Sequence, residues 1–281
     1  MRAIFSFKIL TDPKILEETF FYNYADLAVR SARRYHSVHL YTDAGGKELF
    51  NSYGIEFDSV VVLPEIERYG GSLICMPKIF AMLHQKTPYV HLDFDTFTNH
   101  PYSSQELIGF GYPEVNLKLP VLTSNAILYV YDQYIQHSET FFKGKFPIDF
   151  EKSWEWSFIP NFSAIIVNKP TIVHYIYREI LKHVKDLAYD ELTPSYLATF
   201  IEQFLFVQYL NKLGIKHSYD YESAPSVFSE RGSLRIGTNE YFFDDVYTLT
   251  VMIQSLKHNH FAGYRHNPGF SGVIDTLRQS I

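Results

Sequence analysis

Along the first hundred residues, short apolar runs alternate with segments in which apolar positions recur at helical spacing. This pattern predicts strands and helices in alternation. Apolar runs bounded by turn-forming residues predict strands, while apolar positions that recur every three to four residues predict helices. The strands expected on this basis are residues 2 to 9, 37 to 43, 57 to 63 and the run beginning at 89. The helices expected between them are residues 22 to 35 and 76 to 85, the second with Pro77 in its first turn.

This alternation predicts an α/β fold, with a Rossmann-like, mainly parallel mixed sheet and helices on both of its faces. In such folds ligands bind beyond the carboxyl ends of the strands. The second strand, SVHLYTD, is expected to close in a turn at Asp43-Ala44-Gly45-Gly46.

The pattern loosens after residue 100 and then returns. Residues 101 to 120 and 142 to 160 contain Pro and Gly breakers and no clear period, which is typical of insertions or lids beside a site. SAIIVN is then a strand, residues 170 to 187 a helix, and a further helix runs from an N-cap at Thr193 to Gly214. We expect one domain over 1–281, with a first half over residues 1–100 and a second half over residues 101–281.

Composition narrows the classes of protein to consider. The chain has 281 residues, 46% of them hydrophobic, and a net charge of −6 without a basic block, which argues against a nucleic-acid binder. One cysteine excludes an intrachain disulfide framework and is compatible with the cytoplasm. No signal-peptide pattern or membrane span is evident, although an aromatic share of 17% leaves room for association with the inner face of a membrane.

Two acids stand at the end of the fourth predicted strand. In YVHLDFDTFTNHPY, Asp93 and Asp95 are separated by one Phe, so on extended backbone their side chains point to the same side. Carboxylates so placed can share a hard divalent cation, directly or through water. The alternative is that one acid caps a turn and the other is solvated.

A second concentration of polar chemistry lies near the C-terminus. SLKHNHFAGYRHNP holds His258, His260 and His266 together with Gly263 and Arg265. Imidazole suits manganese better than magnesium, glycine allows backbone N–H groups to approach an anion, and an arginine can neutralise a diphosphate. A solvated, His-rich loop is the alternative interpretation.

Together the two segments resemble glycosyltransferases of the GT-A fold, and especially family eight, which includes glycogenin and bacterial galactosyl and glucosyl transferases. Asp93 and Asp95 match the DxD of that family, and His260-Phe261-Ala262-Gly263-Tyr264-Arg265 resembles its C-terminal HFxGxxK motif. The resemblance implies a hexosyltransferase that uses a nucleotide sugar, most readily a UDP-sugar, and Mn²⁺ or Mg²⁺. It implies that residues 1–100 are the nucleotide-binding half and residues 101–281 the acceptor-binding half. It implies Asp95 and His260 as direct metal ligands, with His258 as an alternative, and Asp93 as a ligand through water or a contact to the donor.

The same resemblance suggests further site residues. Asn161 and Ser163 occupy the place of a donor-contacting strand, and Glu202-Gln203 resembles the acidic-Gln pair near the reacting sugar. The structural alternative for that pair is a solvated position on an amphipathic helix. Lys78, Gly263 and Arg265 are candidate donor contacts, and Glu202 and Gln203 are the candidate catalytic residues for a retaining transfer to a glycan or other hydroxyl acceptor.

Two other functions fit parts of the sequence. The DxD stretch is also similar to the first motif of haloacid dehalogenase-like phosphatases, with Asp93 as nucleophile and Asp244-Asp245 as a late acidic pair. Against it, Phe97 stands where that family carries Thr or Val, and the motif follows several elements instead of opening the fold. A non-catalytic nucleotide- or glycan-binding module is the third hypothesis.

Overall fold

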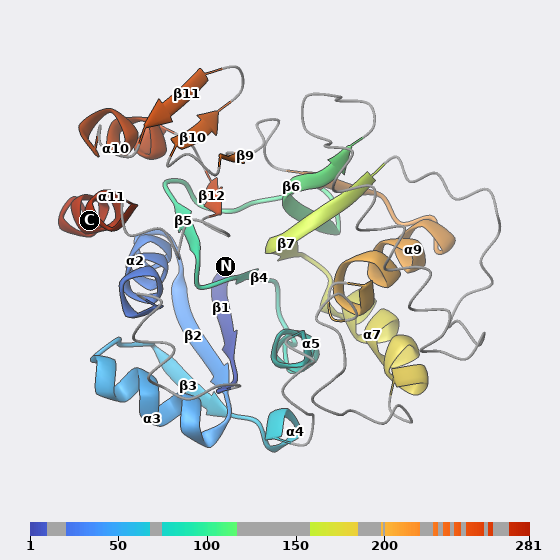
Figure 1. Cartoon of the computed structure of the whole chain (residues 1–281). Helices are drawn as coiled ribbons and strands as arrows, with labels where there is room; N and C mark the ends of the chain where they lie inside the picture. Colours follow the sequence, from blue (N-terminus) through green and yellow to red (C-terminus); the bar gives the residue numbers. More distant parts are fainter. Residues whose placement is uncertain are drawn as a thin grey trace.

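The computed structural model describes residues 1–9, 21–67, 75–116, 158–184, 198, 200–219, 227–229, 233–236, 239–242, 246–255, 258–260 and 270–281. A seven-stranded mixed sheet forms its centre, in the order β3-β2-β1-β4-β7-β6-β8 (Figure 1). The strands are β1 (Arg2–Phe7), β2 (Ser37–Thr42), β3 (Ser59–Val62), β4 (Tyr89–Leu92), β6 (Ile108–Asn116), β7 (Phe158–Val167) and β8 (His217–Tyr219).

The first half of this sheet is parallel, as the sequence predicts. Strands β3, β2, β1 and β4 run in one direction, with Ile4 of β1 level with His91 of β4. Strand β7 then pairs antiparallel with both β4 and β6, while β6 and β8 are parallel. The expected α/β fold class is therefore confirmed.

Helices cover both faces of the sheet. Those described are α2 (Phe21–Arg33), α3 (Ala44–Tyr53), α4 (Pro64–Glu67), α5 (Met76–Leu83), α7 (Pro170–Val184), the π-helix η1 (Phe200–Phe204), α9 (Leu205–Lys212), α10 (Val246–Ser255) and α11 (Ser271–Gln279). One core cluster joins α2 and α3 to one face of the sheet, through residues such as Phe5, Ala28 and Phe50. Because β1 contributes alternate residues to each face, Ile4 belongs instead to the cluster on the opposite face.

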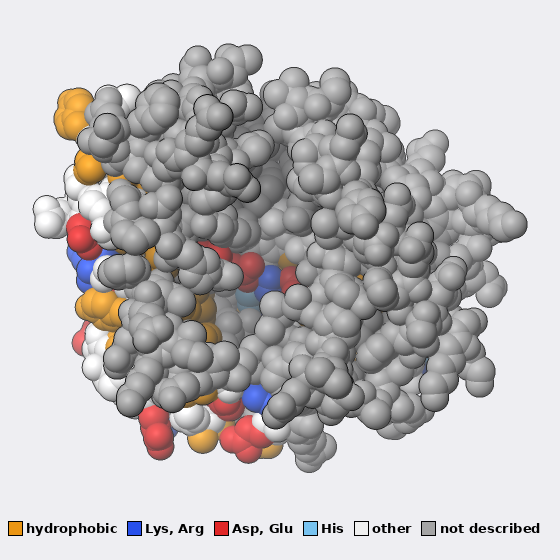
Figure 2. Space-filling model, viewed as in Figure 1, with side chains coloured by type: hydrophobic (Ala, Val, Ile, Leu, Met, Phe, Trp, Pro, Cys, Tyr) orange, Lys and Arg blue, Asp and Glu red, His pale blue; other side chains and the backbone are white. Residues whose placement is uncertain are grey.

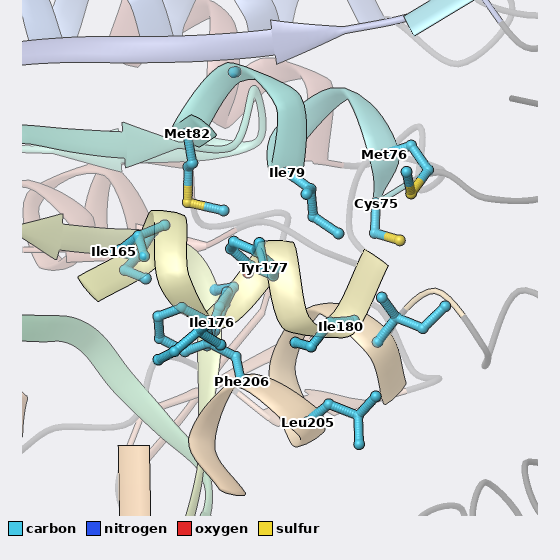
Figure 3. Close-up of a cluster of buried hydrophobic side chains, with 14 of the residues drawn as sticks. Cys75, Met76, Ile79, Met82, Ile165, Ile176, Tyr177, Ile180, Leu205 and Phe206 are labelled. Carbon is cyan, nitrogen blue, oxygen red and sulfur yellow. The ribbon is translucent and has the colours of Figure 1, made fainter. Parts of the chain in front are cut away.

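That opposite face is covered by α5, α7 and α9. Figure 3 shows Tyr177 of α7 among apolar side chains of all three helices, with Ile79 on α5 and Phe206 on α9. Tyr177 and Phe206 have their ring centroids 5.0 Å apart. The packing of these helices fixes where α5 and η1 stand relative to the end of β4.

The predicted turn after the second strand is wrong, because helix α3 begins there. Asp43 is its N-cap, and its Oδ1 accepts a hydrogen bond of 2.7 Å from the backbone N–H of Gly46. Gly46 lies so close to Thr42 that a Cβ atom would be 2.0 Å from its hydroxyl oxygen. The glycines there permit a tight entry into a helix and do not mark a loop. The predicted helix start at Thr193 lies outside the described residues, but Gly214 does follow the end of α9 with a φ of 63°.

The C-terminal elements return to the first half of the chain. A small sheet of β9 (Val227–Ser229), β10 (Ser233–Ile236) and β11 (Asn239–Phe242) precedes α10, and β12 (His258–His260) pairs antiparallel with β5 (Thr96–Thr98). Helix α11 packs on α2, and a third core cluster joins Leu27, Phe97, Ile253 and Phe270 (Figure 1). Phe97 is therefore a core residue that connects the strand after the DxD to the C-terminal helices. In the described part of the chain, no helix combines the length and apolar character that a membrane span requires.

Candidate functional site

The two acids of the DxD lie on a tight turn between β4 and β5. The carbonyl of Asp93 accepts a hydrogen bond of 3.2 Å from the backbone N–H of Thr96, which closes the turn around Phe94 and Asp95. The sequence suggested an extended backbone between the two acids. That expectation is wrong, because the backbone turns there. Phe94 is buried in the core on the α2 and α3 side, while both acids remain partly exposed. Burial of the intervening Phe thus anchors the turn.

Lys78 connects this turn to the π-helix. Its ammonium lies 2.8 Å from Asp93 Oδ1 and 2.5 Å from Glu202 Oε1, and it donates a hydrogen bond of 3.0 Å to the carbonyl of Phe162. The ammonium thus donates to one carbonyl and forms ion pairs with two carboxylates. Three of the candidate residues, from α5, the β4 end and η1, are brought together in this way.

Burial strengthens the electrostatic attraction between Lys78 and the two carboxylates. The side chains of Lys78 and Glu202 are only 10% and 9% exposed, whereas that of Asp93 is 29% exposed. Burial by itself lowers the pKa of Lys78, but Asp93 and Glu202 outweigh it and raise that pKa above its ordinary value. Lys78 is therefore charged, and it holds two carboxylates that would otherwise repel each other.

Glu202 reaches Lys78 from a π-helical turn. Such turns insert one residue into a helix and are frequent at functional sites. Here the turn Phe200–Phe204 buries Glu202 and leaves Gln203 half-buried, while the Tyr177 hydroxyl donates a hydrogen bond of 3.1 Å to the Glu202 carbonyl. Glu202 is not on a solvated helix face, so the alternative position considered for it is wrong.

Asn161 and Ser163 lie beside the turn on β7. Asn161 Oδ1 accepts a hydrogen bond of 2.7 Å from the backbone N–H of Ser163, and the Ser163 carbonyl accepts one of 2.9 Å from the backbone N–H of Asp93. Both residues are almost fully buried. Their observed contacts hold the DxD turn against β7, and their predicted contact with a donor stays a prediction.

The C-terminal His segment lies next to the DxD in space. In the pairing of β12 with β5, His260 is level with Thr96, the residue that follows Asp95, and His258 is level with Thr98. The backbone thus brings together two segments that are far apart in the sequence. Gly263, Arg265 and the Asp244-Asp245 pair lie outside the described residues.

The described side chains do not by themselves provide a complete set of metal ligands. Among the side chains that the structure describes, no group of three or more His, Cys, Asp or Glu residues is placed to hold a metal ion. Asp93 already contacts Lys78, and the backbone of His260 lies level with Thr96, the residue after Asp95. A carboxylate and an imidazole together suit Mn²⁺, and metal binding by Asp95 and His260 stays a prediction.

The site is accessible from one face of the molecule. Figure 2 shows a hollow in which acidic, basic and His side chains are visible, over the place where Figure 1 draws the end of β4. Parallel strands that end at one edge create such openings, which is why ligands of α/β proteins bind there. Charged side chains of the described residues are therefore visible from outside within this hollow.

Two polar residues of the site were missed from the sequence. His91 of β4 is 1% exposed, and its Nε2 lies 2.8 Å from the Ser6 hydroxyl of β1. His91 Nδ1 lies 3.9 Å from Asp93 Oδ1. The signal was a single His inside the apolar run YVHL, two residues before Asp93, on the face of the strand that carries Tyr89.

Comparison with known proteins matches one family model and a number of solved structures. The model of a family of unknown function, DUF6734, matches residues 16–108, and no curated protein matches the chain. Two solved structures superpose loosely on it. Mouse xyloside xylosyltransferase 1 in its apo form is 11% identical to this chain, with a TM-score of 0.33. The match covers 77% of this chain and 76% of the xylosyltransferase chain. The glycosyltransferase GlyE of Streptococcus pneumoniae has 10% identity and a TM-score of 0.35, covering 100% of this chain and 64% of its own.

Proposed function

We propose that this chain is a metal-dependent glycosyltransferase that takes a hexose from a nucleotide sugar, most readily a UDP-sugar, and passes it with retention to a hydroxyl acceptor such as a glycan. The observation that carries the proposal is the pairing of β12 with β5. It places the backbone of His260 level with Thr96, directly after the DxD. Two motifs that resemble those of one glycosyltransferase family thereby become neighbours in space.

The proposed ligands of a divalent cation are Asp95 and His260, with Asp93 contacting the cation through water or the donor directly. Bound there, Mn²⁺ or Mg²⁺ would neutralise the diphosphate and stabilise it as a leaving group. Arg265 and Gly263 follow His260 in the chain and are proposed to contact the same diphosphate.

The chain's own residues supply the remaining chemistry. A glycosyl group that leaves a diphosphate develops positive charge on its anomeric carbon, and a nearby carboxylate or amide oxygen stabilises that charge. Glu202 and Gln203 are proposed for this role. Lys78 holds Glu202 and Asp93 at contact distances of 2.5 Å and 2.8 Å, so the two carboxylates keep a fixed separation without substrate. Charged groups that are held in place before the reaction need no reorganisation during it.

Calorimetry with UDP tests the proposal. We expect UDP to bind with Mn²⁺ and much more weakly without it, and Asp95→Ala to remove most of the metal-dependent part. Glu65→Ala is a matched control, because this exposed acid lies on α4, away from the turn. Equal binding with and without metal would contradict the metal assignment. Hydrolysis of a generic phosphate ester that Asp93→Asn abolishes would favour the phosphatase hypothesis instead.

A further inference from the structure

Asp93 faces a second polar group besides Lys78. His91 and Ser6 lie on neighbouring parallel strands, and both point to the face of the sheet that α5 covers, since Ile4 is level with His91 and Ser6 follows Ile4 by two residues. His91 is fully buried there, with Nε2 2.8 Å from the Ser6 hydroxyl. An imidazolium there would be a second buried cation beside the Lys78 ammonium, which contacts the same Asp93 oxygen, so the neutral imidazole is favoured.

A neutral imidazole carries one proton, on either Nδ1 or Nε2. Nδ1 has no hydrogen-bond partner among the described atoms, and it lies 3.9 Å from Asp93 Oδ1. The ammonium of Lys78 already donates to the Phe162 carbonyl and lies against Asp93 and Glu202, so other acceptors than His91 surround it. A proton on Nδ1 therefore faces a carboxylate, whereas a lone pair there would be repelled by it.

We propose that His91 is a positioning residue for Asp93, and that the Ser6 hydroxyl, by donating to Nε2, keeps the proton of His91 on Nδ1. The distance of 3.9 Å is about 1 Å longer than a hydrogen bond, and the Asp93 side chain is 29% exposed and able to rotate. Lys78 and His91 both approach the same oxygen, Oδ1. Together they turn this oxygen inward and leave the other oxygen for a ligand. Residues that orient a ligating or substrate-binding carboxylate in this way act through it.

The role for His91 rests on the proposed function, but the position of its proton does not. The first test is therefore long-range ¹H–¹⁵N NMR of the whole chain labelled with ¹⁵N-histidine, in which His91 is identified by its absence from the His91→Gln spectrum. We expect a protonated Nδ1 and a bare Nε2 at neutral pH, and a mixture of both tautomers in Ser6→Ala. A wild-type His91 with its proton on Nε2 would overturn the proposal, whether or not the protein transfers a sugar.

The second test uses three replacements that differ in where they keep a donor. His91→Asn keeps an amide N–H close to the Nδ1 position, His91→Gln keeps one close to Nε2, and His91→Phe keeps neither. If His91 orients Asp93, the Gln and Phe variants should lose about 10-fold in metal-dependent UDP affinity and in kcat, and Asn should recover most of the loss. Equal losses in Asn and Phe, with near-UV circular dichroism and unfolding midpoints alike in both, would assign His91 a structural role only.

The two tests keep the failures apart. If wild-type protein binds no UDP and transfers no sugar, the proposed function fails, and the NMR spectrum still decides whether Ser6 and His91 present a donor to Asp93. If wild type is active and Asn does not recover what Phe loses, the proposed function stands and the positioning role falls.

Discussion

At the scale of single residues, Lys78 is the side chain that connects the elements of the site. It lies on α5, yet it contacts the turn after β4 and the π-helix η1, which belong to different parts of the sequence. A buried charge is stable only when it is paired, and the two carboxylates beside it are compensated by the same ammonium. The site residues therefore depend on one another for stability as well as for position.

Lys78→Met should destabilise the protein by about 3 to 5 kcal/mol, because it leaves two carboxylates without their shared cation in a largely buried place. Urea unfolding measures this loss. Lys86→Met is the matched control, since Lys86 is exposed just beyond the same helix, and it should change stability by less than about 0.5 kcal/mol. Similar effects of the two replacements would contradict the buried network. Adding Glu202→Gln to Lys78→Met should restore part of the stability, because it removes one uncompensated charge.

At the scale of elements, the pairing of β5 with β12 decides whether the DxD and the His segment share a site. Both strands are short, and their hydrogen bonds alone are a weak constraint. The core behind them adds to it: Phe97 of β5 packs with Ile253 of α10 and Phe270, which precedes α11. The Asn99 side-chain amide also donates to the carbonyls of Ile253 and Gln254, at 3.3 Å and 2.6 Å. The C-terminal segment is thus anchored on both sides of β12.

A disulfide tests this register. In a Cys75→Ala background, cysteines at Thr98 and His258 should cross-link under mild oxidation, because antiparallel residues level with each other have Cα atoms within disulfide range. Mass spectrometry of an unreduced digest detects the link. Cysteines at Thr98 and Asn259 form the matched control, since position 259 is level with Phe97 and successive positions of a strand have their Cβ atoms on opposite faces. Equal cross-linking of the two pairs would contradict the register.

At the scale of the whole molecule, the two predicted halves interlock. Helix α11 lies against α2, where Arg278 contacts Asp26 at 2.8 Å and Asn23 at 2.7 Å. Near the N-terminus, His36 Nδ1 donates to the Met1 carbonyl at 3.1 Å, and its Nε2 accepts the backbone N–H of Tyr102 at 3.2 Å. The contacts of Arg278 and Tyr102 connect residues before 40 with residues after 100. Neutral, buried histidines are therefore part of what holds the fold together.

Stability should fall as the pH is lowered from about 7 toward 5. Burial lowers the pKa of His36, His91 and His217 in the folded chain, whereas in the unfolded chain each titrates near the ordinary value of 6.5. Below that value the unfolded state binds protons that the folded state does not, so protonation favours unfolding by about 1.4 kcal/mol for each pKa unit of lowering.

Urea midpoints between pH 5 and 7.5 measure this dependence. His36→Gln should flatten it, because the Gln oxygen can accept the Tyr102 N–H at every pH. His84→Gln replaces an exposed histidine and should leave the dependence as in wild type. A slope of opposite sign, or one that neither replacement changes, would show that buried neutral histidines do not set the acid sensitivity.

Local patterns in the sequence predicted much of the fold. The sequence predicted the strands that begin at residues 2, 37, 59 and 89, and the helices α2, α5 and α7. Their apolar positions follow the period of a strand or of a helix. Helix α3 was missed because Gly45 and Gly46 indicate a turn until the Asp43 cap is seen. The burial of Glu202 was also missed, because a π-helical turn shifts the side-chain directions that a regular helix would give.

The sequence by itself determined the α/β class and the candidate residues Asp93, Asp95, Lys78, Glu202 and His260, because residue types and short spacings are local properties. Only the tertiary structure decided which of them meet. The charge network joins Lys78, Asp93 and Glu202 through packing of α5, β4 and η1, and the backbone of His260 reaches the DxD through a strand pairing. Contacts between distant segments depend on how whole elements pack, and neither the pairing of β12 with β5 nor the partner of His91 has a local signal.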